Sequence, residues 1–339
     1  MTEIGARAVA CLLGGAVGDA LGYPVEFVGS GAAILAAHGQ GAPLRLLRCP
    51  DGQVHFSDDT QMTLFTAEGL VRARRAGQPP SNAIDDVHAA YQRWLYTQWP
   101  DQFERPEGGG LIDEPLLVAR RAPGNTCLRA LYENVQNARV PTVASPPNDS
   151  KGCGAIMRSA PFGLAARDAR EAFLSARDCA VLTHGHPSGF LSAAYFASLV
   201  FDLGRGASLE AAMANADALL SNELGRDEVA AAVAAAKELP SKPDVLAIEA
   251  LPDGGWVGEW ALAIALACAR GVDPASEAEV REALWRAAAH GGDSDSTASL
   301  AGNLLGAMGA ALPRSWLEEL ELRVLIERAA VDLVATGLE

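Results

Sequence analysis

The sequence has few cysteines, and their spacing excludes two classes of protein. There are six among 339 residues, they are scattered along the chain, and no two of them form a C-x-x-C pair. Structural zinc sites and small disulfide-bonded folds both require closely spaced cysteines. We therefore exclude both classes and expect reduced thiols that pack as small hydrophobic side chains.

Basic residues are also scarce. The chain has 27 Lys and Arg against 42 Asp and Glu, which gives a formal net charge of -15. Such a chain repels nucleic-acid phosphates and anionic lipid surfaces, so we expect neither nucleic acid nor membrane as a partner. A single small anionic ligand, held by local donors or by a metal ion, is compatible with this charge.

Long uninterrupted apolar runs are not evident either. The N-terminal segment carries Glu3 and Arg7, and its apolar stretch ends at Asp19, which does not fit a signal peptide. No other stretch offers the ~20 apolar residues of a membrane-spanning helix. We therefore expect a cytoplasmic protein.

The pattern of apolar residues predicts helices throughout. β-Branched residues are few, whereas apolar residues three and four positions apart recur between segment ends marked by Ser, Asp, Gly or Pro. The predicted helices are 58–77, 170–182, 188–203, 208–220, 226–238, 258–270, 276–290 and 297–312. Faces of small residues, such as Ala301, Gly302 and Gly306, indicate closely packed helical layers. The prediction is an all-α fold.

No linker divides the chain. The loosest segments, 100–113 and 141–155, are short enough to be surface loops. We therefore expect residues 1–339 to form a single domain.

Acidic residues gather at two predicted helix starts that are far apart in the sequence. The first reads Ser57-Asp58-Asp59-Thr60, and N-capping is the simpler explanation when this segment is taken alone. The second carries Asp293 and Asp295, whose carboxylates can point the same way if the segment is extended. An EF-hand does not fit the second segment, because its sixth position would be Ala298 rather than Gly.

A metal site follows if these two helix starts meet. Two carboxylates 4 Å apart repel each other by about 4 kcal/mol at an effective dielectric near ~20. Protonation relieves this repulsion, but a divalent cation does so better at neutral pH. All candidate ligands are oxygens, so the pattern favours Mg²⁺, Mn²⁺ or Ca²⁺ over zinc.

Three further segments carry polar residues. Glu26 stands between Val25 and Phe27; it is either a surface residue or, in a cleft, a candidate acid or base with a raised pKa. The glycines of 148–158 allow backbone N–H groups to approach an anion, although a plain loop-to-helix turn explains them as well. The histidines of 183–189 fit metal binding, ring stacking or capping.

Taken together, these segments resemble the ADP-ribosylglycohydrolase family, which includes dinitrogenase reductase-activating glycohydrolase and the ADP-ribosyl-acceptor hydrolases. The motifs are GDALGYPVEF, FSDDTQM, GCGAIMRSAP, THGHPSG and HGGDSDSTASLAGNLLGA, with residues 121–127 as a further matching segment. The resemblance extends from about Ala8 to about Leu312. The resemblance implies a compact all-α domain with two Mg²⁺ ions at the bottom of a metal cleft, which the loops between helices form. Mn²⁺ is a possible substitute for Mg²⁺.

The resemblance also implies roles for particular residues. The metal ligands are expected to be Ser57, Asp58, Asp59, Asp293, Asp295 and Ser296. The two serines stand where the family often has Thr, and Thr297 is an alternative to Ser296. Proton transfer falls to Glu26, Asp58 or Asp59. Gly152, Cys153, Gly154 and Met157 are expected to hold the diphosphate of ADP-ribose, with His184 on the ligand side.

The function implied is hydrolysis of ADP-ribose from modified protein side chains, with arginine as the expected acceptor and free ADP-ribose as a product. One alternative is an O-linked serine or acetyl adduct or another ribosyl compound as the substrate. Another is a non-catalytic protein that binds ADP-ribose or a toxin. The acids of the motifs are all present, which favours the enzyme. We expect a monomer.

Overall fold

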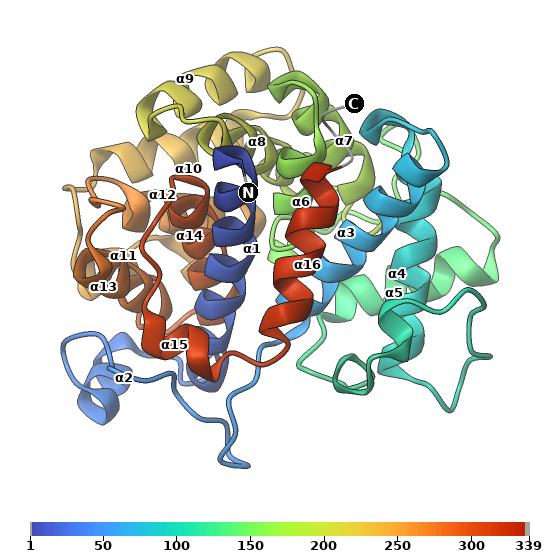
Figure 1. Ribbon diagram of the computed structural model, residues 1–339. Coiled ribbons are helices and arrows are strands. Elements are labelled where there is room, and N and C mark those ends of the chain that lie inside the picture. Colours follow the sequence, from blue (N-terminus) through green and yellow to red (C-terminus); the bar gives the residue numbers. More distant parts are fainter. Residues whose placement is uncertain (1, 336–339) are drawn as a thin grey trace.

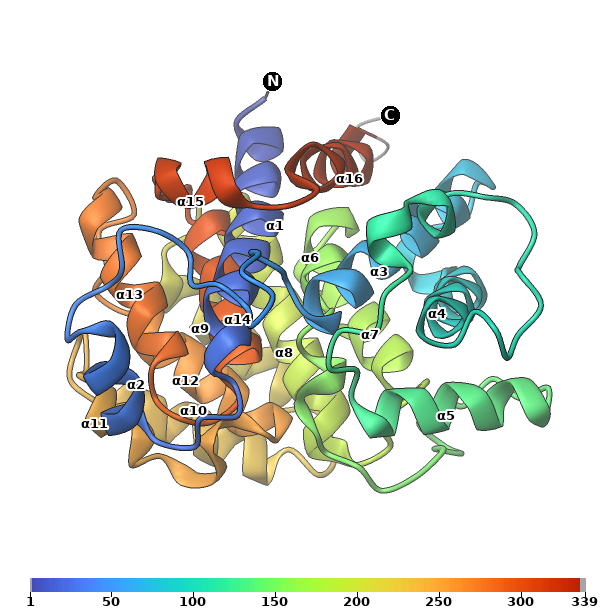
Figure 2. The ribbon, with the colours of Figure 1, turned by 90° about the horizontal axis from the view of Figure 1, so that it is seen from below.

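The protein is described by a computed structural model that covers residues 2–335. In these residues the regular structure is entirely helical, apart from two isolated β-bridges at Thr142–Ser145 and Gly152–Val257. The predicted all-α class is confirmed. Figures 1 and 2 show helices α3 to α5 on one side of the molecule and α10 to α13 on the other, with α1 and α14 between them.

Sixteen α-helices are present in the described part of the chain. Their bounds are α1 Glu3–Gly22, α2 Gly31–His38, α3 Asp58–Arg75, α4 Ile84–Gln98, α5 Asn125–Gln136, α6 Ala160–Ala165, α7 Ala169–Ala180, α8 Pro187–Gly204, α9 Leu209–Leu220, α10 Asp227–Glu238, α11 Val245–Glu249, α12 Gly258–Ala269, α13 Glu277–Ala288, α14 Ser294–Ala307, α15 Arg314–Glu319 and α16 Arg323–Ala335. Short 3₁₀ turns, among them Tyr23–Val25 and Cys153–Ala155, connect several of them.

Half of the sixteen described helices begin at a residue whose side chain caps them. The side chains of Asp168, Ser208 and Ser276 accept hydrogen bonds from the first turns of α7, α9 and α13. Ser57 does the same for α3, where its Oγ accepts from the N–H of Asp59. Such caps satisfy backbone donors that a helix leaves unpaired at its start.

The antiparallel pair α1 and α14 forms the centre of the fold, and glycine makes its close packing possible. A Cβ atom added at Gly14 would lie 2.2 Å from the carbonyl oxygen of Gly302, and one at Gly18 would lie 2.0 Å from that of Ala298. Gly22 meets Ser294 in the same way. These contacts recur every four residues, which is the spacing of one helix face. They fix the C-terminal end of α1 beside the N-terminal end of α14.

Two boundaries differ from the sequence prediction. Helix α14 covers 294–307 rather than 297–312, because Ser294 and Asp295 already belong to its first turn and the chain turns away at Gly309, whose φ is 89°. Residues 18–22, the first half of the motif GDALGYPVEF, are the last turns of α1, a helix that the predicted set did not contain. The acidic and glycine residues of both motifs therefore lie partly inside helices.

Helix α1 is long and apolar enough to cross a membrane by length and composition, which the sequence analysis did not recognise. The segment Glu3–Val25 has a mean hydropathy of 1.5. However, 72% of its most apolar window is buried inside the structure, against α14, α16 and other helices. This burial is what the central helix of a globular core requires.

Candidate functional site

Eleven of the twelve predicted site residues line one pocket of about 200 Å³, which we call the acid pocket. They are Glu26, Asp58, Asp59, Gly152, Cys153, Gly154, Met157, His184, Asp293, Asp295 and Ser296. The twelfth, Ser57, lies next to the pocket without lining it. Segments from five separate regions of the sequence are thus brought together, as the motifs predicted.

The first turns of α3 and α14 supply the acids at the base of the acid pocket. Asp58 and Asp59 open α3, and the Asp58 carboxylate accepts a hydrogen bond from the N–H of Gly124 at 3.3 Å. Asp295 is the second residue of α14, and Asp293 is its N-cap residue. Asp293 and Asp295 thus stand at a helix start rather than in an extended segment, and both side chains reach the pocket.

A buried acid that the sequence analysis did not select holds the start of α3 in place. One carboxylate oxygen of Asp19 accepts from the N–H of Ser57 at 2.7 Å, and the other accepts from the N–H and the hydroxyl of Thr60 at 2.9 and 2.6 Å. Burial, and then the charge of Asp295, raises its pKa to about 7. Its only signal in the sequence is an acid within a run of small apolar residues.

The carboxylates of the acid pocket are crowded. Oxygen atoms of Glu26, Asp293 and Asp295 all lie within 4.8 Å of one another, and all three side chains are buried. Burial raises the pKa of Glu26 to about 10, with Asp295 and Asp293 adding to the effect. The pKa values of Asp58, Asp59, Asp293 and Asp295 are also raised, above all by burial.

This cluster fits a divalent cation. Glu26 Oε2 and Asp59 Oδ2 are buried and have no hydrogen-bond partner among residues 2–335. Of the described residues, no Lys or Arg lines the pocket to balance the acids. A set of closely spaced carboxylate and hydroxyl oxygens without a balancing cation is the donor set that Mg²⁺, Mn²⁺ or Ca²⁺ prefers.

The structure distinguishes the two neighbouring hydroxyls of α14. Ser296 lines the acid pocket. The Thr297 hydroxyl is directed into the protein, where Oγ1 lies 2.7 Å from the carbonyl oxygens of Ala287 and Asp293 and 2.8 Å from Nε2 of His290. Ser296 is therefore the one placed to reach a cation in the pocket.

The glycine loop 152–154 is held against the acids by the turn at 252–257. The N–H of Cys153 donates to the carbonyl oxygen of Trp256, and the N–H of Asp293 donates to that of Gly254. The thiol of Cys153 donates to Asp293 Oδ2, with 2.6 Å between the heavy atoms. Trp256 also lines the pocket and stacks on the exposed ring of Phe27, with centroids 6.1 Å apart. This aromatic pair was not predicted.

Two charged or polar neighbours of the pocket have structural partners. Lys151 forms ion pairs with Glu228 at 2.8 Å and Glu259 at 2.7 Å, so its charge is already balanced. His186 caps α8 by accepting from the N–H of Ser188, which agrees with a structural role. His184, by contrast, lines the pocket.

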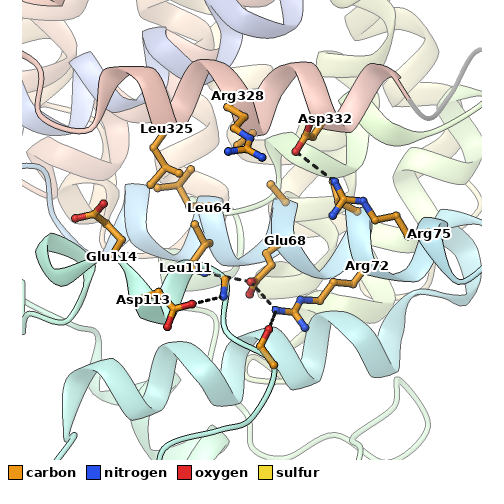
Figure 3. A pocket seen from close by; sticks show the side chains of 15 residues that line it. Leu64, Glu68, Arg72, Arg75, Leu111, Asp113, Glu114, Leu325, Arg328 and Asp332 are labelled. Atoms are coloured by element: carbon orange, nitrogen blue, oxygen red, sulfur yellow. Dashed lines mark hydrogen bonds and ion pairs between the residues drawn. The ribbon is translucent and has the colours of Figure 1, made fainter.

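A second, larger cavity of about 660 Å³ lies between α3, α16 and the loop 108–114 (Figure 3). It contains none of the predicted site residues. Many of its charges pair with one another or with nearby residues: Glu68 bonds to Arg72 and Arg93, Asp113 to Arg105, and Asp332 to Arg75. Unpartnered carboxylate oxygens are found instead in the acid pocket, so we place the chemistry there.

Comparisons with known proteins identify the family and the fold. The family model described as ADP-ribosylglycohydrolase matches residues 1–338. A protein of Archaeoglobus fulgidus, described as an uncharacterized protein, is 27% identical over 331 residues that cover 95% of this chain and 94% of that protein. A solved structure described as an ADP-ribosylglycohydrolase-related protein complex is similar over 100% of both chains, with 25% identity and a TM-score of 0.70.

Proposed function

The chain belongs to the ADP-ribosylglycohydrolase family, and from that premise we propose that it is a Mg²⁺-dependent hydrolase that removes ADP-ribose from arginine side chains of modified proteins. Family and fold support a hydrolase of ADP-ribose linkages. The observation that carries the proposal is the cluster of Glu26, Asp293 and Asp295, buried together with an unpartnered oxygen on Glu26.

Metal binding would fall to the oxygens at the two helix starts. The oxygens that line the acid pocket belong to Asp58, Asp59, Asp293, Asp295 and Ser296. Ser57 lies next to them and accepts a hydrogen bond from the N–H of Asp59. Two ions suit four aspartates, and Mn²⁺ is a possible substitute. When bound, such ions orient the ribose hydroxyls and polarise a water molecule for attack.

The residues of the chain would move the protons. In the reaction the bond between ribose C1″ and the guanidine nitrogen breaks, its electron pair stays on the nitrogen, and a water oxygen bonds to C1″. The nitrogen must gain a proton and the water must lose one. Glu26 comes from a different segment than the four aspartates and keeps an unpartnered oxygen, so we assign it to proton transfer, with Asp58 or Asp59 as alternatives.

The remaining pocket residues would bind the ADP-ribosyl group. We assign the diphosphate to four of the residues that line the acid pocket, namely Gly152, Cys153, Gly154 and Met157. A side chain at residue 154 would not fit, because its Cβ would lie 2.8 Å from Sγ of Cys127 and 2.9 Å from Cε1 of His184. This explains why the loop has glycine there.

The test is the release of free ADP-ribose from an arginine-ADP-ribosylated protein, first with Mg²⁺ and then with EDTA, beside a serine-linked substrate. Metal-dependent release from arginine alone is expected. Release from the serine-linked substrate alone would replace the acceptor but keep the enzyme class. No release from either substrate, by a protein that still binds ADP-ribose, would leave a binding protein instead.

A further inference from the structure

Below the acid pocket lies a buried cation without an acidic partner. Arg158 is 1% exposed, and among residues 2–335 no carboxylate oxygen lies within 4.0 Å of its guanidinium group. Its neighbours are the thioether of Met62 and the thiol of Cys127, both at 3.5 Å, and the ring of Tyr91, whose centroid is 4.2 Å from Cζ. Burying a charge without a counter-ion costs free energy, so we expect the charge of Arg158 to have a function.

The one strong hydrogen bond of this guanidinium goes to a hydroxyl. Nη2 of Arg158 donates to Oγ1 of Thr183 at 2.6 Å. The hydroxyl oxygen of Thr183 therefore acts as an acceptor toward Arg158, because arginine has no acceptor and stays protonated. The proton of the Thr183 hydroxyl must point to another atom.

Among the described residues, one strong acceptor is available to that proton, because the sulfur of Cys127, which also lies beside the Thr183 hydroxyl, is only a weak acceptor. Oγ1 of Thr183 lies 2.8 Å from Nδ1 of His184 and 3.5 Å from the carbonyl oxygen of Ala180. The carbonyl oxygen of Ala180 already accepts from the N–H groups of Thr183 and His184, which occupy its two lone pairs. The Thr183 hydroxyl therefore donates to Nδ1, and a neutral His184 must carry its proton on Nε2.

The Nε2 atom of His184 is directed toward the acid pocket. His184 lines the pocket, and a Cβ atom added at Gly152 or Gly154 would lie 3.4 or 3.3 Å from Nε2. No described residue forms a hydrogen bond with Nε2. The ring is neutral at physiological pH, because burial and then the charge of Arg158 lower the pKa of His184 to about 3.

We propose that Arg158 and Thr183 are positioning residues that hold His184 as the neutral Nε2–H tautomer. The pocket then presents a fixed N–H donor to its ligand, and His184 is neither a general base nor a cation. An acceptor oxygen, such as a phosphate oxygen of ADP-ribose, is the ligand group that fits this donor. The identity of the ligand rests on the proposed function, whereas the tautomer does not.

The tautomer is tested on the protein without ligand, by long-range ¹H–¹⁵N NMR of ¹⁵N-histidine-labelled chain. The His184 signals are identified by their loss in His184→Asn. We expect one proton-bearing nitrogen at ε2 and one unprotonated nitrogen at δ1, unchanged from about pH 5 to about pH 8. A proton on Nδ1, or a ring that titrates within this range, would overturn the proposal.

Variants separate the positioning role from simple stabilisation. Thr183→Val removes the hydroxyl at nearly constant size; we expect a mixture of tautomers and ADP-ribose affinity about tenfold weaker, since one hydrogen bond is lost. Thr183→Ser keeps the hydroxyl, so it should show the single tautomer of His184 and the wild-type affinity for ADP-ribose. Thr97→Val is the control, because the described partners of this buried hydroxyl lie within α4: it donates to the carbonyl oxygen of Trp94 and accepts from the side-chain amide of Gln98. A Thr183→Val protein with an unchanged His184 spectrum would contradict the proposal.

The two proposals fail in different ways. The expected tautomer together with no binding of ADP-ribose would support the positioning role and count against the proposed function. If the protein binds and releases ADP-ribose but its His184 carries the proton on Nδ1, the proposed function is supported and the positioning role is contradicted.

Discussion

Asp19 on α1 accepts a hydrogen bond from the backbone N–H of Ser57, the residue that caps α3, at 2.7 Å. Through this contact and the two bonds from Thr60, one carboxylate fixes the helix start that carries Asp58 and Asp59. The neighbouring face of the same helix α1, with Gly14, Gly18 and Gly22, packs against α14, which carries Asp295. Helix α1 thus determines the separation of the two acidic helix starts.

Replacing Asp19 with Asn should lower the affinity for a metal ion more than it lowers the free energy of unfolding. An amide retains one acceptor oxygen, but its NH₂ group cannot accept from the N–H of Ser57 or Thr60, so the start of α3 loses a partner. We expect Mn²⁺ affinity, followed by electron paramagnetic resonance, to fall about tenfold or more. Asp85→Asn, an exposed change on α4, is the control. Equal Mn²⁺ affinity in Asp19→Asn and the wild type would show that the contact does not position the acids.

The glycine contacts between α1 and α14 predict a second effect. In Gly18→Ala the new Cβ would lie 2.0 Å from the carbonyl oxygen of Ala298, so the two helices must separate. We expect the free energy of unfolding to fall by about 1–3 kcal/mol or more, as for other overpacked cores. Urea denaturation measures it.

Gly204→Ala provides the matched control for that change. Gly204 ends α8, and a Cβ atom there would meet nothing within 4 Å. Alanine favours helix over glycine by up to about 1 kcal/mol, so this variant should be as stable as the wild type or more so. Similar losses in both variants would contradict the role of the α1–α14 contact.

The raised pKa values predict that the stability of the metal-free protein decreases as the pH rises. A carboxyl group whose pKa is raised by folding keeps its proton in the folded state while the unfolded chain has released it. Stability therefore falls as pH rises, by about 1.4 kcal/mol per pH unit for each proton retained. The pKa of Glu26 is about 10, so this residue keeps its proton across this range and the fall should be visible from about pH 7 to about pH 8. Asp19, with a pKa of about 7, contributes to the fall below this window. This window lies above the ordinary range of histidine and below that of most thiols.

Mg²⁺ should reverse this trend, because it replaces the protons of the acid pocket. We expect the rise in melting temperature caused by MgCl₂, relative to NaCl at equal ionic strength, to be larger at about pH 8 than at about pH 7. Thermal unfolding of EDTA-treated protein measures both effects. A metal-free stability that increases across this window would show that the acids are not held protonated by the fold.

The sequence was sufficient for the fold class and for most of the acid pocket, because the acids, glycines and His184 lie in short motifs. It was insufficient for Asp19, whose role appears only when α1 lies beside Ser57. It also placed the start of α14 at 297, whereas the helix begins at Ser294, which packs against Gly22 of α1. Contacts between residues nearly 300 positions apart, such as Asn303 with the carbonyl of Cys11, leave no local pattern.

The same limit applies to helices outside the predicted set. Helices α4, α5 and α16 were not predicted as separate elements, although their buried residues follow helical spacing. Helix α5 supplies Asn125, Thr126 and Cys127 to the acid pocket. Polar residues at a helix start resemble loop residues in the sequence, and the tertiary structure is needed to see which of them face a site.

Substitutions of Glu26 and Asp295 should separate proton transfer from metal binding. Glu26→Gln keeps the size of the side chain but cannot transfer a proton, so turnover should fall by about 10²–10⁴-fold, the usual contribution of general acid–base catalysis. Some activity and most of the Mn²⁺ affinity should remain. Asp295→Ala removes one of the three carboxylates that lie close together in the cluster of Glu26, Asp293 and Asp295. Both turnover and Mn²⁺ affinity should therefore be lost.

Glu238→Gln, an exposed change on α10, controls for the loss of a negative charge and should leave both quantities unchanged. Release of ADP-ribose and Mn²⁺ binding are measured on the same preparations, so that the two losses can be compared directly. Wild-type turnover in Asp295→Ala would remove this residue from the metal site. Turnover of Glu26→Gln close to that of the wild type would instead transfer the proton step to Asp58 or Asp59, because these are the other carboxylates at the start of α3 that line the acid pocket.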